Sequence, residues 1–543
     1  MKRLILLSWT LATTLLTWAV TVPSDFRVVC KDGSAVYFCG VGTELTFNED
    51  GTILYIQTEG QDAVVSYAVD GIEAIEFAQL GVVYDAYDYA GDHIDVVFSS
   101  ADNISFSEAE EEIITDDTHD DYGDFIENYK PKNTVVITYK EGGKATYTGK
   151  PSGVNVIVSG NHVMVTSSKK DVAYTLKGST TNGSFKLYSD KKSQINLNGV
   201  SITNPTGAAI NIQSGKTMLI KLADGTTNYL EDGAEYTLTD GEQQKGTFFS
   251  EGQLVFSGEG ALNVKSNYGH GIASDDYVRV RGGNITINST RDGISTSDRF
   301  IMYGGDVNIT ALQDGIDVDE GYIEIGAGQL TVNAGDEGIT ASYEGDEDTG
   351  VIDPLITPYI DIKGGLVKVT TTGDKGHGLR AMSTLNMSGG IVQATVMGAG
   401  SKALMSEGDM SLTGGKVTAF AEGGALYESD INDLSSSACV RSKGVLTIEN
   451  ITLGVKSTGT GGKGINNVGD VTIKNSRVAV VASGETHRHD GLDSRSRGVT
   501  TDGNLTLDGG SLLVKSYDEP LYVKGVQNFL NKAVYNGYLT NAK

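Results

Sequence analysis

One short pattern organises this chain, and it recurs as Gly269-His270-Gly271-Ile272, Arg291-Asp292-Gly293-Ile294 and Gln313-Asp314-Gly315-Ile316. A pair of small residues closes each copy, beginning at residues 282, 304 and 327, which are 22 and 23 residues apart. Looser copies extend the pattern over residues 258–514. A fixed period of this length is typical of proteins that are built from stacked repeats.

Between these markers, apolar residues alternate with Thr, Ser and Asn, as in Val278-Arg279-Val280 and Ile285-Thr286-Ile287. This two-residue period predicts short strands, and the glycines predict turns that need a positive φ. Two or three short strands within 22–25 residues make one coil of a parallel β-helix. The pattern therefore predicts an all-β solenoid of about ten coils, in which neighbouring coils lie about 4.8 Å apart.

We expect four parts along the chain. Residues 1–20 read as a signal peptide, because Lys2 and Arg3 precede an apolar run that is short for a membrane span. Residues 22–107 read as a small β module of unknown function. Residues 108–132 read as a solvated acidic linker, since residues 108–124 hold nine acidic residues and no Lys or Arg. The repeats then occupy residues 133–543.

The composition limits the partners of the protein. Its formal net charge of −28 at pH 7 argues against nucleic acid or an anionic membrane and favours cations. Three cysteines are too few for a disulfide framework. We expect an exported monomer without a membrane span, located in the periplasm, on the cell surface or outside the cell.

Two stretches, Leu187–Ile202 and Leu222–Leu230, carry a resemblance to a known family, and the repeated Asp-Gly-Ile units and Asp490–Ser494 add to it. They resemble a bacterial family of β-helical carbohydrate-binding domains, similar in architecture to family 9 pectate lyases. The resemblance covers residues 134–514. It implies a right-handed parallel β-helix that binds calcium and acidic or plant cell-wall polysaccharide without requiring lyase activity. An insertion at residues 495–501 departs from the family pattern.

The residue before each Gly-Ile, and its equivalents further along, forms a column that reads His270, Asp292, Asp314, Glu337, His377, Lys402, Lys463 and Arg497. Carboxylates about 4.8 Å apart repel each other by roughly 3.5 kcal/mol at an effective dielectric of about 20, so they either take up protons or recruit a cation. Calcium tolerates irregular sets of oxygen ligands, and we therefore expect calcium as the cofactor.

The candidate metal ligands are the acidic residues of this column and those close to it in sequence, with one further pair near the C-terminal end. They are Asp275, Asp276, Asp292, Asp298, Asp314, Asp317, Asp319, Glu320, Glu337, Asp490 and Asp493. In the alternative interpretation, the aspartates cap turns by accepting hydrogen bonds from backbone amides.

A second column stands five residues before each marker and consists of Tyr277, Arg299, Tyr322 and Tyr359. Both tryptophans, Trp9 and Trp18, lie in the expected signal peptide. Tyrosine must therefore supply any stacking against sugar rings, and this column is our candidate carbohydrate-binding site. In the alternative interpretation, the column is an aromatic ladder that covers a strand edge.

These observations lead to a functional prediction. We expect an exported, calcium-dependent protein that binds polysaccharide, acidic rather than neutral, and does not cleave it. The first alternative is a calcium-assisted polysaccharide lyase, in which Lys402 or Arg380 would be the base. The second alternative is a structural surface spacer or adhesin.

Overall fold

The computed structural model describes residues 20–21, 26–31, 35–38, 43–48, 50, 52–58, 65–77, 85–87, 94–96, 106–345 and 349–539. The expected signal peptide lies outside the described residues, apart from Val20. The described chain is nearly all strand, and its helical segments are the short 3-10 turns η1 (Val69–Gly71), η2 (Asp120–Asp124) and η3 (Ile126–Asn128). Within these residues, no helix is long and apolar enough to cross a membrane.

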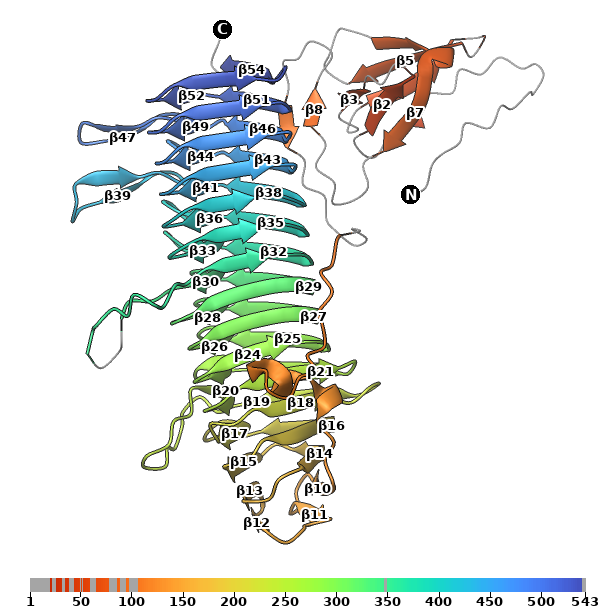
Figure 1. The fold of residues 1–543 in the computed structure, drawn as a ribbon, viewed down its shortest axis with the longest axis vertical. Helices are drawn as coiled ribbons and strands as arrows, with labels where there is room; N and C mark the ends of the chain where they lie inside the picture. Colours follow the sequence, from red (N-terminus) through yellow and green to blue (C-terminus); the bar gives the residue numbers. More distant parts are fainter. Residues whose placement is uncertain are drawn as a thin grey trace.

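A sheet of fifteen strands runs along the molecule and carries the Asp-Gly-Ile repeats (Figure 1). Its first two strands are antiparallel, and the following ones pair in parallel with the equivalent strand of the next coil. In order, the strands are β12 (Val154–Ser159), β13 (Asn161–Ser167), β15 (Gly183–Ser189), β17 (Ile210–Gln213), β20 (Gly246–Ser250), β23 (His270–Ser274), β26 (Ile294–Thr296), β28 (Ile316–Val318), β30 (Ile339–Ala341), β33 (Leu379–Ala381), β36 (Lys402–Ser406), β41 (Ala438–Ser442), β44 (Lys463–Asn467), β49 (Arg497–Thr501) and β52 (Glu519–Val523).

The remaining strands of the coils belong to a second sheet of 26 strands. They are β10 (Asn133–Tyr139), β11 (Thr146–Thr148), β14 (Val172–Thr180), β16 (Ser193–Thr203), β18 (Met218–Leu222), β19 (Thr227–Glu231), β21 (Leu254–Gly258), β22 (Ala261–Lys265), β24 (Tyr277–Val280), β25 (Asn284–Ser289), β27 (Arg299–Ala311), β29 (Tyr322–Ala334), β31 (Ile360–Ile362), β32 (Leu366–Thr371), β34 (Leu385–Met387), β35 (Ile391–Val396), β37 (Met410–Leu412), β38 (Lys416–Ala421), β42 (Leu446–Glu449), β43 (Thr452–Ser457), β45 (Val471–Lys474), β46 (Arg477–Ala482), β50 (Leu505–Asp508), β51 (Ser511–Ser516), β53 (Gln527–Leu530) and β54 (Val534–Leu539).

Eight strands of this second sheet pair in parallel as a closed ring, and in this sense they form a parallel barrel. The long strand β16 pairs with both β18 and β19, and the long strand β27 pairs with both β24 and β25. The other pairings, β18 with β21, β21 with β24, β19 with β22 and β22 with β25, complete the ring. Two rows of strands are thereby joined at both ends of this region.

The prediction of a single right-handed parallel β-helix of about ten coils is therefore wrong. The described strands form several sheets, one of them holds fifteen strands, and eight strands close into a barrel. The cause is local: Gly304-Gly305 was expected to be a turn that separates two strands, but the chain stays extended through it as part of β27. A bulge, with Gly305 at φ +84°, absorbs the pair without breaking the strand.

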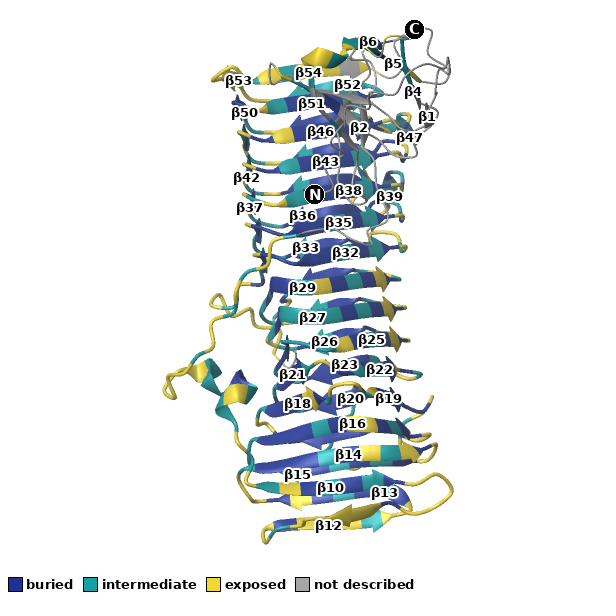
Figure 2. Cartoon of the chain, turned by 90° about the vertical axis from the view of Figure 1, so that its right-hand side faces the viewer, coloured by how far each residue is buried: buried dark blue, intermediate teal, exposed yellow. Residues whose placement is uncertain are grey.

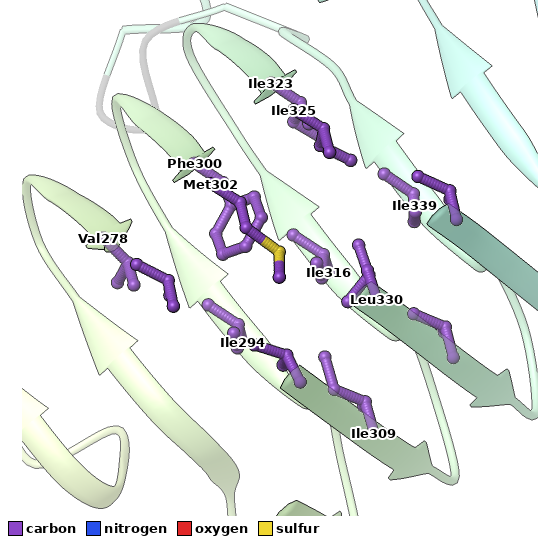
Figure 3. Close-up of a cluster of buried hydrophobic side chains, with 14 of the residues drawn as sticks. Val278, Ile294, Phe300, Met302, Ile309, Ile316, Ile323, Ile325, Leu330 and Ile339 are labelled. Atoms are coloured by element: carbon purple, nitrogen blue, oxygen red, sulfur yellow. The ribbon is translucent and has the colours of Figure 1, made fainter. Parts of the chain in front are cut away.

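The interior of the stack is a continuous apolar core. Ile294, Ile316 and Ile339 are paired neighbours in β26, β28 and β30, and each is at most 1% exposed. Figure 3 shows these residues facing Val278, Phe300 and other apolar side chains across the interior. Burying each such side chain contributes about 1.5–3 kcal/mol, so the repeated isoleucine stabilises every coil in the same way.

Polar side chains alternate with the core residues and face outward. Along β25, for example, Ile285 and Ile287 are buried, whereas Asn284 and Asn288 are exposed. Figure 2 shows the same alternation of buried and exposed positions along the stack. The two-residue period predicted from the sequence is thus confirmed, and the outer faces of the sheets carry the polar columns.

Residues 107–129, which we call the acidic strap, lie against the outside of the 26-stranded sheet, drawn in orange in Figure 1. Backbone hydrogen bonds hold one end, from Gly365 N to Ser107 O at 2.8 Å and from Ala109 N to Gly326 O at 2.8 Å. At the other end, the Tyr129 hydroxyl donates to Val172 O at 3.3 Å. The segment that was expected to be a solvated acidic linker thus contacts the sheet at both of its ends.

Two hairpins project from the fifteen-stranded sheet on the same side of the stack (Figure 1). The first consists of β39 (Leu426–Glu428) and β40 (Asp433–Ser435), and the second of β47 (His487–His489) and β48 (Leu492–Ser494). The rings of Tyr427 and His489 stack with centroids 4.0 Å apart, which joins the two hairpins.

The N-terminal part contains three smaller antiparallel sheets, and two of them enclose a separate apolar cluster that includes Val28, Leu54 and Ile56. Their strands are β1 (Val20–Thr21), β4 (Thr43–Phe47), β5 (Ile53–Thr58) and β6 (Val65–Ala68) in one sheet, β3 (Ala35–Phe38), β2 (Phe26–Cys30) and β7 (Ile72–Phe77) in the second, and β8 (Asp85–Tyr87) with β9 (Ile94–Val96) in the third.

Candidate functional site

The predicted charged column lies at the beginning of successive strands of the fifteen-stranded sheet, and its side chains form a ladder. From Asp292 to His377, each side chain accepts a hydrogen bond from the backbone amide of the next column residue. Asp314 N donates to Asp292 Oδ1 at 3.0 Å, Glu337 N to Asp314 Oδ1 at 2.8 Å, His377 N to Glu337 Oε2 at 3.0 Å and Lys402 N to His377 Nδ1 at 3.0 Å. Each of these hydrogen bonds therefore joins one coil to the next.

The glycine that follows His270, Asp292, Asp314 and Glu337 is required by close packing. A Cβ atom on Gly315 would lie 2.1 Å from Val332 Cγ1 and 2.4 Å from the carbonyl oxygen of Gly338. No side chain fits between an inward-facing valine and the backbone of the next coil. The Asp-Gly-Ile pattern therefore places one carboxylate at the edge and one isoleucine in the core of each coil.

Crowding and burial shift the pKa values of this acidic column. Burial and, after it, the neighbouring Asp292 raise the pKa of Asp314 to about 7. Burial raises the pKa of Glu337 to about 8, although Arg380, whose guanidinium lies 3.8 Å from Glu337, acts in the opposite direction. Burial and the nearby carboxylates of Asp319 and Asp314 raise the pKa of Asp317 to about 9. Each of these carboxyl groups therefore keeps its proton to a higher pH than an exposed carboxyl group does.

Two pairs of carboxylates are in direct contact. Asp317 shares a side-chain hydrogen bond with Asp319, and Asp276 shares one with Asp298. Burial, followed by the charge of Asp298, raises the pKa of Asp276 to about 6. Thr340 is the strand neighbour of Asp317; it is 2% exposed and its hydroxyl has no hydrogen-bond partner. Burying a polar group without a hydrogen-bond partner costs free energy, so a hydrogen-bond donor or a cation near Asp317 would stabilise this region.

The other predicted metal ligands lie apart from this group. The Asp275 carboxylate is paired with Lys245 Nζ at 2.7 Å. The backbone of Glu320 bonds to Ser297 O at 2.7 Å, in the turn after β28. In the β47–β48 hairpin, the Asp490 side chain is 94% exposed, and Asp493 Oδ1 lies 3.6 Å from an arginine. Across the described residues, no three His, Cys, Asp or Glu side chains converge on one point as a metal site would require.

The predicted carbohydrate-binding column is assembled as a stack on the 26-stranded sheet. The Arg299 guanidinium lies 4.2 Å from the ring centroid of Tyr277 and donates to the Tyr322 hydroxyl at 3.2 Å. The rings of Tyr322 and Tyr359 are parallel within 1° and 4.8 Å apart. Because Tyr322 and Tyr359 stack on each other, one face of each ring is used within the column.

The acidic strap covers one end of this column. The Tyr277 hydroxyl donates to Asp124 Oδ1 at 2.6 Å, and Arg299 Nη2 donates to Asp121 Oδ1 at 2.9 Å. Arg279 is 5% exposed and pairs with Asp124 at 2.9 Å and with Glu111 at 2.7 Å. A sugar could therefore reach Tyr277 only after the strap had left. The sequence analysis missed this contact because the strap and the column are more than 150 residues apart.

A known protein family matches the part of the chain that carries these columns. The family described as carbohydrate-binding domain-containing protein matches residues 159–461, which is more than half of the chain and includes the acidic ladder. The chain belongs to this family. The family expected from the sequence is thus confirmed, whereas the similarity to family 9 pectate lyases remains an expectation.

Two individual proteins are similar to parts of the chain. A carbohydrate-binding domain-containing protein of Acetivibrio thermocellus is 32% identical over 136 residues, which are 24% of this chain and 46% of that relative. The chain thus spans less than half the length of that relative. A solved structure of a polysaccharide lyase-like protein from C. thermocellum, a gadolinium derivative, is 26% identical and covers 43% of this chain and 92% of that chain, with a TM-score of 0.35.

Proposed function

We propose that the protein is exported and binds acidic polysaccharide through bound calcium without cleaving it. The observation that carries carbohydrate binding is the family match, which spans the coils that hold the acidic ladder. The description of the family names carbohydrate binding and no reaction, which supports a non-catalytic role. Calcium, the acidic ligand and export are our extension of that result.

The chemistry of the acidic residues around Asp317 fits a hard divalent cation. The donors are carboxylate oxygens and a buried hydroxyl, which calcium accepts and zinc does not prefer. Burial and, after it, the charges of neighbouring carboxylates raise the pKa of both Asp314 and Asp317, and a calcium ion beside them would neutralise those charges. These side chains would have to turn toward a shared point, with water completing the coordination, because no three of them converge as they stand.

The charge of the protein supports an acidic ligand that binds through a cation. A chain with a net charge of −28 repels a polyuronate, so affinity needs a cation shared between the carboxylates of the protein and those of the sugar. Flat neutral glucans usually require exposed tryptophan, and Trp9 and Trp18 both lie in the expected signal peptide. Bound calcium would present the missing positive charge.

Binding to polygalacturonate and to a neutral glucan, with calcium and with chelator, tests this function. We expect binding to polygalacturonate that disappears with chelator and weakens at least tenfold in Asp317→Asn. Asp190→Asn is the matched control, because Asp190 is exposed and pairs only with the adjacent Lys191, at 2.7 Å. Undiminished binding in chelator, or a preference for the neutral glucan, would disprove the calcium bridge.

The same samples test for cleavage. A lyase would produce unsaturated uronates, whose ultraviolet absorbance rises with time. Lys402, the base considered from the sequence, donates its ammonium hydrogens to Gly400 O at 2.6 Å and to Ser435 Oγ at 2.9 Å. Since these bonds hold the Lys402 ammonium in the protein interior, we expect no increase in absorbance.

A further inference from the structure

A small polar pocket lies where the two hairpins meet the fifteen-stranded sheet. It has a volume of about 180 Å³, and its charged lining consists of the cations Lys463, Arg495 and Arg497 and the carboxylates of Asp433 and Asp493. Pockets for drug-sized ligands usually measure about 300–1,000 Å³. This pocket therefore has room for one sugar residue or for its charged group.

The floor of the pocket is a lysine that lacks an acidic partner. Lys463 is 9% exposed, and its ammonium contacts the hydroxyl of Ser436 and, at 3.3 Å, that of Ser494. The two hydroxyls contact each other at 2.8 Å. Across the described residues, no carboxylate lies within 4.0 Å of the Lys463 ammonium. A buried cation with only neutral partners is unfavourable unless an anion joins it.

Further cations surround this lysine. Arg497 is the strand neighbour of Lys463, its guanidinium lies 3.6 Å from the ring centroid of Tyr522, and its Nε lies 3.1 Å from Glu519. Burial and then the charges of Arg497 and Arg441 lower the pKa of Lys463 to about 7. In a protein with a net charge of −28, this pocket is lined by three cationic and two acidic side chains, so cations outnumber carboxylates here.

We propose that this pocket binds the carboxylate of a uronate residue in the polysaccharide. The ammonium of Lys463 and the guanidinium groups of Arg495 and Arg497 would pair with the carboxylate, and Asp433 would accept hydrogen bonds from sugar hydroxyls. This inference rests on the proposed function and deepens it, because it assigns a second contact point to the acidic chain.

The position of the pocket suits a polymer that also contacts the acidic ladder. Lys463 on β44 is five strands from Asp317 on β28 along the same sheet, which corresponds to about 24 Å. Both residues belong to columns on the outside of that sheet. A polysaccharide lying along this face would meet bound calcium at one end and the cationic pocket at the other.

Affinity for a trigalacturonate oligomer in the presence of calcium tests the pocket. We expect Lys463→Met and Arg495→Gln each to weaken binding at least tenfold while calcium retention stays unchanged. Lys474→Met is the matched control, because Lys474 is paired with Glu449 at 2.7 Å on another sheet. If the pocket variants bind the oligomer as tightly as the wild type, the pocket inference is wrong and the proposed function stands.

Two further measurements separate the remaining outcomes. Because Lys463→Met could disturb folding, acylation of Lys463 in the wild-type protein is followed by mass spectrometry, and we expect the oligomer to slow it at least threefold. Equal acylation with and without the oligomer, or equal affinity for a carboxyl-reduced or sulfated oligomer, would overturn the assignment to a uronate. If the wild type binds no polysaccharide, acidic or neutral, the proposed function fails together with this inference.

Discussion

Among single residues, the buried lysines of the charged column have the strongest conflict between their charge and their surroundings. Lys402 is 7% exposed, and burial and then the positive charge of Arg441 lower its pKa to about 8. Lys375 acts in the same direction, whereas Glu428 and Glu337 oppose it. In the sequence, Lys402 was both a continuation of the acidic column and a candidate base of a lyase.

Replacing Lys402 tests how much this burial costs. The folded-state pKa lies below the ordinary value of 10.5, so the charged form is disfavoured in the folded state. The resulting penalty is fully present below about pH 8 and disappears as the pH rises toward 10.5. The quantity to compare is the free energy of unfolding of Lys402→Met minus that of the wild type. We expect this difference to be more favourable to the variant at pH 6 than at pH 10.5 by on the order of 3 kcal/mol.

Chemical unfolding at pH 6 and pH 10.5 measures this difference. Lys443→Met is the control, because Lys443 is half exposed and paired with Glu407. A difference between wild type and Lys402→Met that is the same at both pH values would contradict the prediction.

At the level of elements, the acidic strap changes how the surface of the 26-stranded sheet can be used. Its Phe125 is fully buried, and the guanidinium groups of Arg279 and Arg281 lie 5.2 and 4.4 Å from the Phe125 ring centroid. The strap thus combines apolar burial with ion pairs that are shielded from water. Such a segment stabilises the coils that it crosses.

Removing a buried carboxylate of the strap should lower the free energy of unfolding substantially. Asp124→Ala leaves Arg279 and the Tyr277 hydroxyl without one partner each, and we expect a loss of about 3–5 kcal/mol. Hydrogen exchange should increase across residues 107–129. Glu127→Ala is the control: Glu127 is 46% exposed and pairs with Arg281 at 2.9 Å, so we expect a loss of at most about 1 kcal/mol. Equal losses in the two variants would contradict this account.

For the whole molecule, the charged column along the fifteen-stranded sheet divides into an acidic part and a basic part. The acidic part extends from Asp292 to Glu337, and the basic part from Lys402 to Arg497. Along one sheet, the protein therefore carries acidic side chains in some coils and basic side chains in others.

Calcium should stabilise the folded protein, because a ligand that binds only the folded state shifts the unfolding equilibrium. We expect chelator to lower the Tm by about 2–5 °C. Asp317→Asn should melt higher than wild type in chelator, since the repulsion with Asp319 is gone, and should gain nothing from calcium. Thermal melting with added calcium and with chelator measures both effects, and a calcium response in Asp317→Asn equal to that of wild type would disprove the ligand assignment.

Much of the fold could be predicted from local patterns. The alternation in Ile285-Thr286-Ile287 predicted a strand with two core residues, and the structure confirms it. The spacing of the Asp-Gly-Ile units predicted that Asp292, Asp314 and Glu337 form a column, and their hydrogen bonds confirm that they do. By contrast, the glycines at 304 and 305 do not end a strand, because a bulge accommodates them when the neighbouring coils supply paired backbone.

The sequence by itself therefore determined which residues face the core, which residues form columns and which family the chain resembles, because a repeat of nearly constant length places equivalent residues in register. Only the tertiary structure decided how strands β16 and β27 close the barrel, where the acidic strap docks and that two hairpins enclose Lys463. These features depend on contacts between residues far apart in the chain. Such contacts form where charge and shape match in space, and no local spacing encodes them.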